Sequence, residues 1–314
     1  MKTGNSLNSD NPSDKSYFKA EVLLKTDGYM LAAKTIMDNL LSGLHKSRMT
    51  GFNIEFSEYR QLNTGDDSKY IDWKLYAKTD KLFVKKYEEE SVLSASILCD
   101  NSKSMGFCGG ASAGGLSKLE YAKYIIACII YKIIRQRDYI ELRKFNDIVT
   151  PLISATNTAV ILNSVDNILT ELQPESTTDF IKSFGDYLIT LKKKKLAVII
   201  SDLIIERGDL RNIIKPLTML QSGGNNIIFI HILDNAELNL DFNINGPVEF
   251  LGLETADRIL VDPSKIREKY KKIMNNNLRI IETELAAAGI GYIQINTCIP
   301  LEKNIMKIFR PQKK

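Results

Sequence analysis

Two short runs of apolar residues, each closed by an aspartate, constrain the fold of this chain more than any other feature. The first run is 96–100 (SILCD) and the second is 196–202 (LAVIISD). The second is apolar up to its last two residues, which is typical of a central parallel strand covered by helices on both faces. We therefore expect both runs to be buried strands, with Asp100 and Asp202 at their carboxyl ends.

Strand and helix patterns alternate from the first of these runs to the C-terminus. Two of the strand patterns flank Asn146-Asp147, which predicts a hairpin turn. The predicted strands are 92–98, 139–145, 148–153, 226–233, 258–261 and 290–296, and the predicted helices are 117–137, 158–171, 179–191, 209–222, 263–288 and 301–309. Strands separated by helices of this length predict an α/β fold with a doubly wound, mostly parallel sheet.

One of the predicted helices has both of its ends marked in the sequence. Asp262 suits the N-cap position, because its carboxylate accepts hydrogen bonds from free backbone amides, and Pro263 suits the first helical position. Gly289 follows the apolar pattern and can adopt the left-handed conformation that commonly ends a helix. We therefore expect a long amphipathic helix between Pro263 and Gly289.

The N-terminal third of the chain differs in pattern from the rest. Residues 1–19 are polar and rich in Ser, Asn and Asp, which predicts a disordered lead. Residues 20–93 hold a helix pattern at 28–47 and a strand pattern at 82–87, and we expect them to form an N-terminal appendage beside the sheet. The α/β domain itself is expected to span residues 94–314.

Composition and charge argue against several classes of protein. The longest apolar stretch, 124–134, is interrupted by Lys132 and falls short of the roughly 20 residues of a membrane helix. The net charge is only +4, and no aromatic residues interleave with the basic run 192–195, so no nucleic acid is expected as a partner. The four cysteines form no C-x-x-C pair. We expect a cytoplasmic protein that binds neither a membrane nor a nucleic acid.

The first of the two aspartates opens a D-x-S-x-S loop. In an open parallel sheet, ligands bind beyond the carboxyl ends of the strands, where the strand order reverses. The alternate spacing can turn one carboxylate and two hydroxyls toward a common point, and hard oxygen ligands of this kind suit Mg²⁺ or Mn²⁺. A poorly neutralised ion with an open position is expected to attract a carboxylate from a partner protein. The predicted metal ligands are Asp100, Ser102, Ser104, Thr178 and Asp202.

These residues also have an ordinary structural interpretation. An Asp that precedes a Ser often only caps a helix, and Asp202 can cap the segment that follows it. Two aspartates at the ends of two buried strands favour the metal site over separate caps. The glycine-rich loop 106–115 does not match a phosphate-binding loop, because Lys118 follows Leu116-Ser117 and not a glycine.

The loop resembles the metal-ion-dependent adhesion site of von Willebrand factor A domains. In that family D-x-S-x-S is followed by a distant threonine and by an aspartate that closes a later strand. The resemblance covers roughly residues 94–310 and implies that all five predicted ligands bind the metal. This chain lacks the glycines that usually precede the threonine, so Thr177 is an alternative to Thr178.

The segment before the loop resembles the domain-of-unknown-function 58 family, whose members join such a lead to an A-like domain. The matching residues are Leu44-His-Lys-Ser47, Gly51, Phe56, Arg60, Gly65-Asp-Asp67, Ile71-Asp-Trp73, Ala77-Lys-Thr79, Leu82, Val84-Lys85 and Glu88-Glu-Glu90. This resemblance implies a link with MoxR-type AAA+ ATPases, for which the chain would act as an adaptor or cofactor in the assembly or maturation of client proteins.

A binding module is therefore the preferred interpretation of the sequence, and an enzyme is not expected. A hydrolase of phosphate esters would use the same metal, yet the third position of the loop is Ser102 where one class of phosphatase needs an aspartate. Asp147 and Asp179 are conceivable bases, but nothing in the sequence places them near the loop. A scaffold that binds no metal is the remaining alternative.

Overall fold

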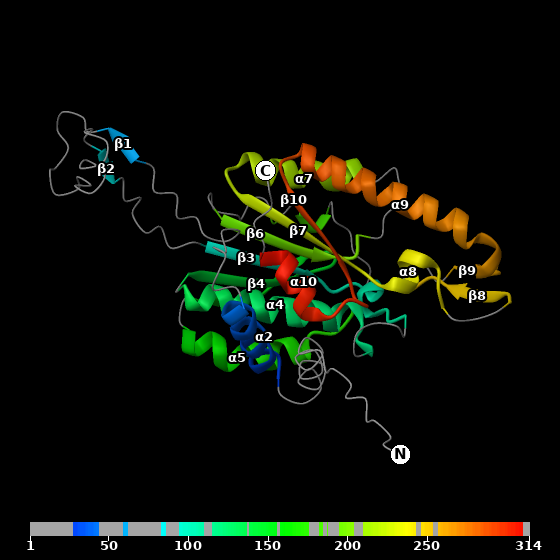
Figure 1. Cartoon of the computed structure of the whole chain (residues 1–314), viewed down its shortest axis with the longest axis horizontal. Helices are drawn as coiled ribbons and strands as arrows, with labels where there is room; N and C mark the ends of the chain where they lie inside the picture. Colours follow the sequence, from blue (N-terminus) through cyan, green and yellow to red (C-terminus); the bar gives the residue numbers. More distant parts are fainter. Residues whose placement is uncertain are drawn as a thin grey trace, which may run out of the picture. The chain divides into compact units, whose positions relative to one another are not determined.

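The computed structural model describes residues 28–43, 59–61, 83–85, 94–109, 115–136, 138–155, 158–175, 182–184, 187, 195–203, 210–242, 246–253 and 257–309 (Figure 1). The chain divides into two compact units, Met1–Lys46 with Leu93–Ile308, and Ser47–Val92 with Phe309–Lys314. In the second unit, β1 (Tyr59–Gln61) and β2 (Phe83–Lys85) form an antiparallel pair.

A six-stranded sheet forms the centre of the first unit, in the order β10-β7-β6-β3-β4-β5. The strands are β3 (Ser94–Asp100), β4 (Tyr139–Phe145), β5 (Val149–Ala155), β6 (Lys195–Ser201), β7 (Asn226–Leu233) and β10 (Gly291–Asn296). Only the edge strand β5, which forms the expected hairpin with β4, runs antiparallel to its neighbour. The predicted doubly wound, mostly parallel α/β sheet is thus confirmed.

Helices cover both faces of this sheet because the two halves of the chain wind in opposite directions. They are α4 (Lys118–Arg135), α5 (Thr158–Glu171), α7 (Leu210–Ser222), α9 (Pro263–Ala287) and α10 (Leu301–Phe309). Figure 1 shows α4 and α5 on one side of the sheet and α7 and α9 on the other. The apolar side chains of α7 and α9 pack on Leu98, Ile199 and Phe229 in one buried core.

This winding places the reversal of strand order between β3 and β6. The chain leaves β3 toward β4 on one side, by way of α4, and leaves β6 toward β7 on the other, by way of α7. At such a reversal the two connections diverge and leave room beyond the carboxyl ends of the strands. The two predicted strand-ending aspartates therefore lie at the reversal of strand order.

The first helix of the described chain, α2 (Tyr29–Gly43), belongs to the unit of the sheet. The hydroxyl of Tyr29 donates to Glu120 Oε2 of α4 at 2.8 Å, and the backbone amide of Met30 donates to Asp166 Oδ1 of α5 at 2.9 Å. Met30 and Met37 are buried. The expected appendage over residues 20–93 is therefore divided, because the apolar face of α2 is covered by α4 and α5.

Several helix and strand ends agree with the sequence patterns. Asp262 caps α9 by accepting from Ser264 N at 3.1 Å, Pro263 occupies the first turn, and Gly289 has a φ of +74° after its end. The short helix α8 (Asn235–Asn239) and the strand β8 (Val248–Leu251), which pairs with β9 (Arg258–Val261), were not predicted. Most of the predicted helix 179–191 lies outside the described residues.

Within the part of the chain that the structure describes, no helix is long and apolar enough to cross a lipid bilayer.

Candidate functional site

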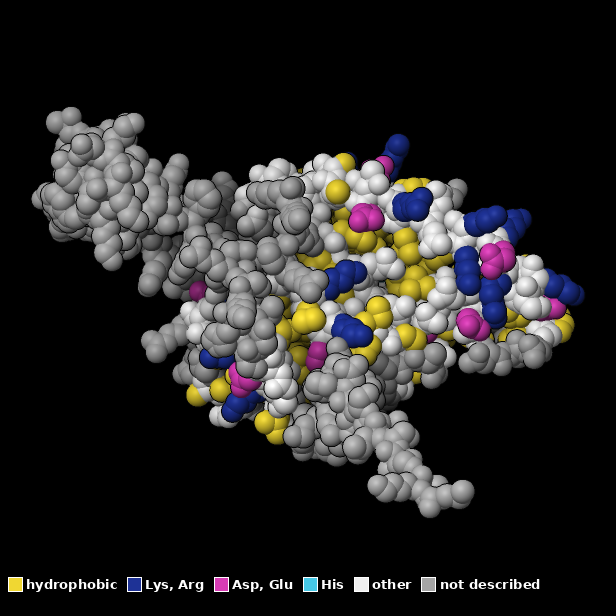
Figure 2. Space-filling model, in the orientation of Figure 1, with side chains coloured by type: hydrophobic (Ala, Val, Ile, Leu, Met, Phe, Trp, Pro, Cys, Tyr) yellow, Lys and Arg dark blue, Asp and Glu magenta, His cyan; other side chains and the backbone are white. Residues whose placement is uncertain are grey.

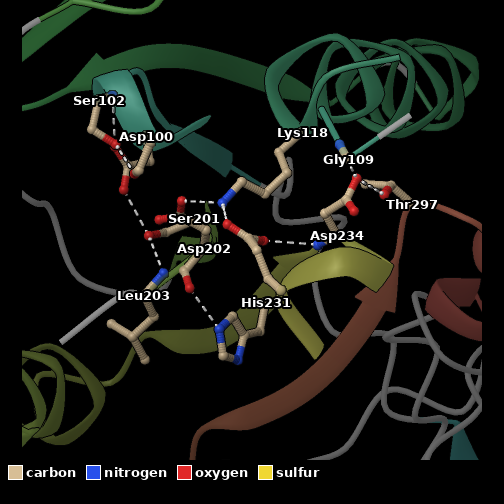
Figure 3. A network of polar contacts seen from close by, with 12 residues as sticks. Asp100, Ser102, Gly109, Lys118, Ser201, Asp202, Leu203, His231, Asp234 and Thr297 are labelled. Carbon is tan, nitrogen blue, oxygen red and sulfur yellow. Dashed lines mark hydrogen bonds and ion pairs between the residues drawn. The ribbon is translucent and has the colours of Figure 1, made fainter. Parts of the chain in front are cut away.

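Asp100 and Asp202 lie at the same edge of the sheet, as the sequence predicted (Figure 3). Asp100 is the last residue of β3, and Asp202 directly follows β6. These two strands are parallel neighbours in which Cys99 is paired with Ile200, so their carboxyl ends are level with each other. The side chains of Asp100 and Asp202 are almost fully buried.

The D-x-S-x-S loop folds back on its own carboxylate. Asp100 Oδ1 accepts a hydrogen bond from the backbone amide of Ser102 at 2.9 Å. The hydroxyls of Ser102 and Ser104 are 3.0 Å apart, because the 3-10 turn Lys103–Gly106 brings the two serines to one side. The structure thus brings together three of the predicted ligands, Asp100, Ser102 and Ser104, in a buried position.

Ser201 connects this loop to the neighbouring strand. Its hydroxyl donates to Asp100 Oδ2 at 2.6 Å and accepts from the backbone amide of Leu203 at 3.0 Å. Leu203 has a φ of 39°, in the left-handed region that non-glycine residues rarely adopt. The chain therefore turns sharply after Asp202, and this turn is held by the same serine that holds Asp100.

The carboxylate of Asp202 is engaged by a residue that the sequence analysis did not assign to the site. Lys118 Nζ donates to Asp202 Oδ2 at 2.7 Å and to Glu237 Oε1 at 2.5 Å. Lys118 opens α4 and is fully buried, with its ammonium group 5.7 Å from the ring centre of Phe107. Asp202 thus lies at the expected edge, but its carboxylate binds an internal cation.

The charges of this buried group are strongly coupled. Burial lowers the pKa of Lys118, but Asp202 and Glu237 raise it by more, so that the pKa stands above its ordinary value. Burial raises the pKa of Glu237, and Lys118 opposes this shift without cancelling it. Lys118 is therefore an ammonium ion at neutral pH, held between the carboxylate of Asp202, directly after β6, and that of Glu237 in α8.

His231 contacts the backbone of the same turn. Its Nε2 lies 2.7 Å from the carbonyl oxygen of Asp202, and its Nδ1 lies 2.8 Å from the hydroxyl of Tyr292. Burial lowers the pKa of His231 to about 4, so the ring is neutral at pH 7. Neutral imidazole can donate from Nε2 to the carbonyl and accept at Nδ1 from Tyr292, which satisfies both nitrogens.

The carboxylate of Asp234 contacts three loops at this edge of the sheet. Its carboxylate accepts from the backbone amide of Gly109 and from the hydroxyl of Thr297, both at 3.1 Å, and it caps α8 through Ala236 N at 2.8 Å. Glu237 completes this cap by accepting from Asp234 N at 2.9 Å. A Cβ atom on Gly109 would overlap Asp234 Oδ1, so this close approach requires glycine. The loops after β3, β7 and β10 are therefore fixed to one another.

The sequence contained a signal for some of these residues and none for others. Asp234 and Glu237 have the spacing of a capping box, a pattern that predicts the start of a helix. Lys118 has no such signal, since its two partners lie 84 and 119 residues away along the chain. The predicted ligand Thr178 and its alternative Thr177 lie outside the described residues.

The oxygen atoms of the loop fit a hard divalent cation in part. Asp100 offers a carboxylate and the two serines offer hydroxyls. The buried side-chain oxygen of Asn101 in the same loop has no hydrogen-bond partner among the residues that the structure describes. A buried acceptor of this kind is normally satisfied by a cation or a water molecule. Within the described ranges no three His, Cys, Asp or Glu side chains converge, so a cation here would depend on hydroxyl and water ligands.

The comparisons with known proteins identify a family and similar folds. The sequence model of a family described as "Protein of unknown function DUF58" matches residues 58–279. No curated protein matches the chain in sequence. BatB from Bacteroides thetaiotaomicron is similar in structure, with a TM-score of 0.40 and 13% identity over 69% of this chain and 98% of that protein.

Two other solved structures have similar scores. An aerotolerance-related membrane protein from Bacteroides fragilis has a TM-score of 0.41 and 14% identity over 69% of this chain and 98% of that one. The von Willebrand factor A domain of SpRpn10 has a TM-score of 0.39 and 13% identity, over 68% of this chain and 94% of that domain. Function does not follow from likenesses of this size.

Proposed function

The chain belongs to the DUF58 family, and from this premise we propose that it is a protein-binding module whose D-x-S-x-S loop holds Mg²⁺ or Mn²⁺. The ion would be held by Asp100, Ser102 and Ser104, and would supply a positive centre that contacts a carboxylate of the partner. The observation that carries this proposal is the convergence of one buried carboxylate and two buried hydroxyls at the reversal of strand order.

The carboxylate of Asp100 favours a cation at this position. It is almost fully buried, and a buried carboxylate is costly unless hydrogen bonds or positive charge compensate for it. It already accepts hydrogen bonds from Ser102 N and from the hydroxyl of Ser201. A divalent ion would add positive charge beside Asp100, while Lys118 continues to neutralise Asp202.

The partner is proposed on the family resemblance. A MoxR-type AAA+ ATPase is the partner class that the lead segment 44–90 implies, and the chain would act as its adaptor in the assembly or maturation of client proteins. A carboxylate from the ATPase or from its client would complete the coordination of the ion. Binding of this kind needs the preformed loop and no catalytic base, which agrees with a module that performs no chemistry of its own.

Magnesium is expected to stabilise the wild-type protein and to have no effect on an Asp100→Asn variant. At a concentration 100 times the dissociation constant, bound Mg²⁺ adds about 2.7 kcal/mol to the free energy of unfolding. For a unit of this size that corresponds to a rise in melting temperature of about 5–10 °C. Thermal unfolding with and without Mg²⁺ measures the rise, and Asp147→Asn, in the turn after β4, serves as the matched control that keeps it.

Two results would contradict the assignment of the metal. An equal rise in melting temperature in the Asp100→Asn variant would place the ion elsewhere, and the absence of a rise in the wild type would leave a metal-free scaffold. Hydrolysis of para-nitrophenyl phosphate with Mg²⁺, lost in Asp100→Asn, would instead make the chain a hydrolase. Isothermal titration of the Ser102→Ala variant with Mg²⁺ measures the affinity for the ion when one ligand is removed and the carboxylate of Asp100 is kept, so that loss of a ligand can be distinguished from loss of the fold.

The partner class has its own test. Immobilised full-length chain is expected to retain the purified MoxR-type ATPase of the same organism in Mg²⁺, and the Asp100→Asn variant to retain it at least about tenfold more weakly. The comparison of the wild type with the variant is more informative than a comparison with and without chelator, because a chelator also removes Mg²⁺ from the ATPase. Equal retention by both proteins would remove the proposed role of the metal, and no retention by either would remove the ATPase.

A further inference from the structure

A second surface, separate from the metal loop, lies on the hairpin of β8 and β9. Glu249 is paired with Leu260, and Leu251 with Arg258, in an antiparallel register. Among the described residues no third strand pairs with either outer edge. Two-stranded sheets are marginally stable on their own, and their unpaired amides and carbonyls are available to another strand. The hairpin therefore has the open edges that a partner strand requires.

The hairpin exposes aliphatic side chains that a free surface normally avoids. Its exposed fractions are 56% for Leu251, 49% for Leu253, 59% for Ile259 and 73% for Leu260. On the face opposite to Leu251 and Leu260, Phe250 packs edge-on against Phe242 with ring centres 5.2 Å apart. One face thus packs on the preceding segment through Phe250 and also carries the exposed Ile259, while the other presents Leu251 and Leu260 to solvent.

Basic residues outnumber acidic ones in β9 and the first half of α9, and Glu249, which is paired with Leu260, adds one exposed acidic side chain to the hairpin. Residues 257–279 contain seven Lys and Arg against three Asp and Glu, a surplus of +4 that equals the net charge of the entire chain. Lys265, Lys269 and Lys272 are exposed on the first half of α9. Figure 2 shows Lys and Arg side chains over the end of α9 that adjoins the hairpin, with Asp and Glu side chains among them. A partner at this surface would gain from negative charge.

We propose that the hairpin β8–β9 and the first half of α9 form a docking surface for an extended segment of another protein that is both acidic and aliphatic. The segment adds a third strand to the hairpin, its aliphatic side chains cover Leu251 and Leu260, and its carboxylates face the lysines of α9. This mode combines main-chain hydrogen bonds with side-chain selectivity. The surface requires no metal and so goes beyond the proposed function of the D-x-S-x-S loop.

Two other occupants are less favoured by the same observations. A second copy of the chain would bring an equal basic surplus against this surface, and like charges oppose the contact. An anionic membrane would match the charge and the leucines, but lipid chains cannot bond to the open amides and carbonyls of the strand edges. An extended peptide satisfies the apolar surface, the charge and the backbone groups together.

The test uses a fluorescein-labelled peptide of five Glu-Val repeats and the full-length chain. Fluorescence anisotropy is expected to show saturable binding that weakens by about tenfold or more when Leu251 and Leu260 are both changed to Ser. Lys265→Glu with Lys269→Glu is expected to weaken it similarly, and a peptide of Lys-Val repeats is expected not to bind. The matched controls are Ile148→Ser, an equally exposed aliphatic residue elsewhere, and Lys34→Glu on α2, both of which keep the affinity.

Binding of this peptide is expected to persist in EDTA and in the Asp100→Asn variant. A failure of the proposed docking surface can therefore be distinguished from a failure of the proposed metal site. The proposal is overturned if the wild type does not bind the Glu-Val peptide, or if the leucine and lysine variants bind it unchanged. A wild-type dimer in sedimentation that Leu251→Ser with Leu260→Ser dissociates would assign the surface to a second copy. Sedimentation with phosphatidylserine vesicles, lost in the same variant, would assign it to a membrane.

Discussion

Replacing Lys118 by methionine is expected to lower the free energy of unfolding by about 3–5 kcal/mol, because it leaves the buried carboxylate of Asp202 without its cation. Methionine fills a similar volume, so the loss comes from charge and not from a cavity. Glu237, the second carboxylate on the same ammonium, loses its partner as well. Urea unfolding of the wild type and the variant at pH 7 and constant ionic strength measures the difference.

A second buried lysine on the same helix serves as a control for the general cost of removing a buried cation. Lys123 is also buried, but its partner Glu120 is about one-third exposed and remains in contact with water when the lysine is lost. Lys123→Met is therefore expected to cost about 1 kcal/mol or less. The double variant Lys118→Met with Asp202→Asn is expected to recover part of the lost stability, since the uncompensated charge is gone. Equal losses for Lys118→Met and Lys123→Met would show that the Asp202 carboxylate is not the cause.

Acid is expected to destabilise the protein by about 3 kcal/mol through His231 alone, as the pH falls from 6.5 to 4. The unfolded state binds a proton near pH 6.5, whereas burial lowers the pKa of the folded state to about 4. Between these values only the unfolded histidine is protonated, and protonation pulls the equilibrium toward unfolding. Above pH 6.5 both states are neutral, and His231 makes no pH-dependent contribution.

The measurement compares the wild type with His231→Gln. The amide of glutamine can still donate to the carbonyl of Asp202, but it does not titrate. Urea unfolding at several pH values gives a difference in stability between the two proteins that is constant above pH 6.5 and changes by about 3 kcal/mol toward pH 4. Carboxylates titrate in both proteins and cancel in the difference. A difference that stays constant down to pH 4 would mean that water reaches the ring and that its pKa is not lowered.

Much of the fold followed from local patterns. The strands that end at Asp100 and Ser201 were recognisable because both are covered on two faces and therefore apolar almost throughout. The ends of α9 were recognisable because Asp262 and Gly289 have conformational preferences that act within a few residues. Patterns of this range predicted β9 but not its partner β8, which is four residues long and has every second residue exposed.

The positions of four candidate site residues also followed from local patterns. Asp100, Ser102 and Ser104 lie together because they share one loop, and Asp202 lies at the same edge because parallel neighbouring strands end side by side. The assignment of residues 20–93 to one appendage did not foresee that α2 packs on α4 and α5, since an amphipathic helix does not specify which surface covers it.

The sequence by itself determined which segments form the central sheet and the helices that cover it, and that two aspartates lie at the ends of buried strands, because periodicity and capping act over a few residues. The tertiary structure alone decided what the carboxylate of Asp202 binds. Its partner Lys118 is 84 residues distant along the chain, and the two are brought together when β6 joins the sheet and α4 packs on that sheet. A buried charge is neutralised by a group that the fold brings close to it. Local sequence patterns do not specify which residues distant in the chain become neighbours.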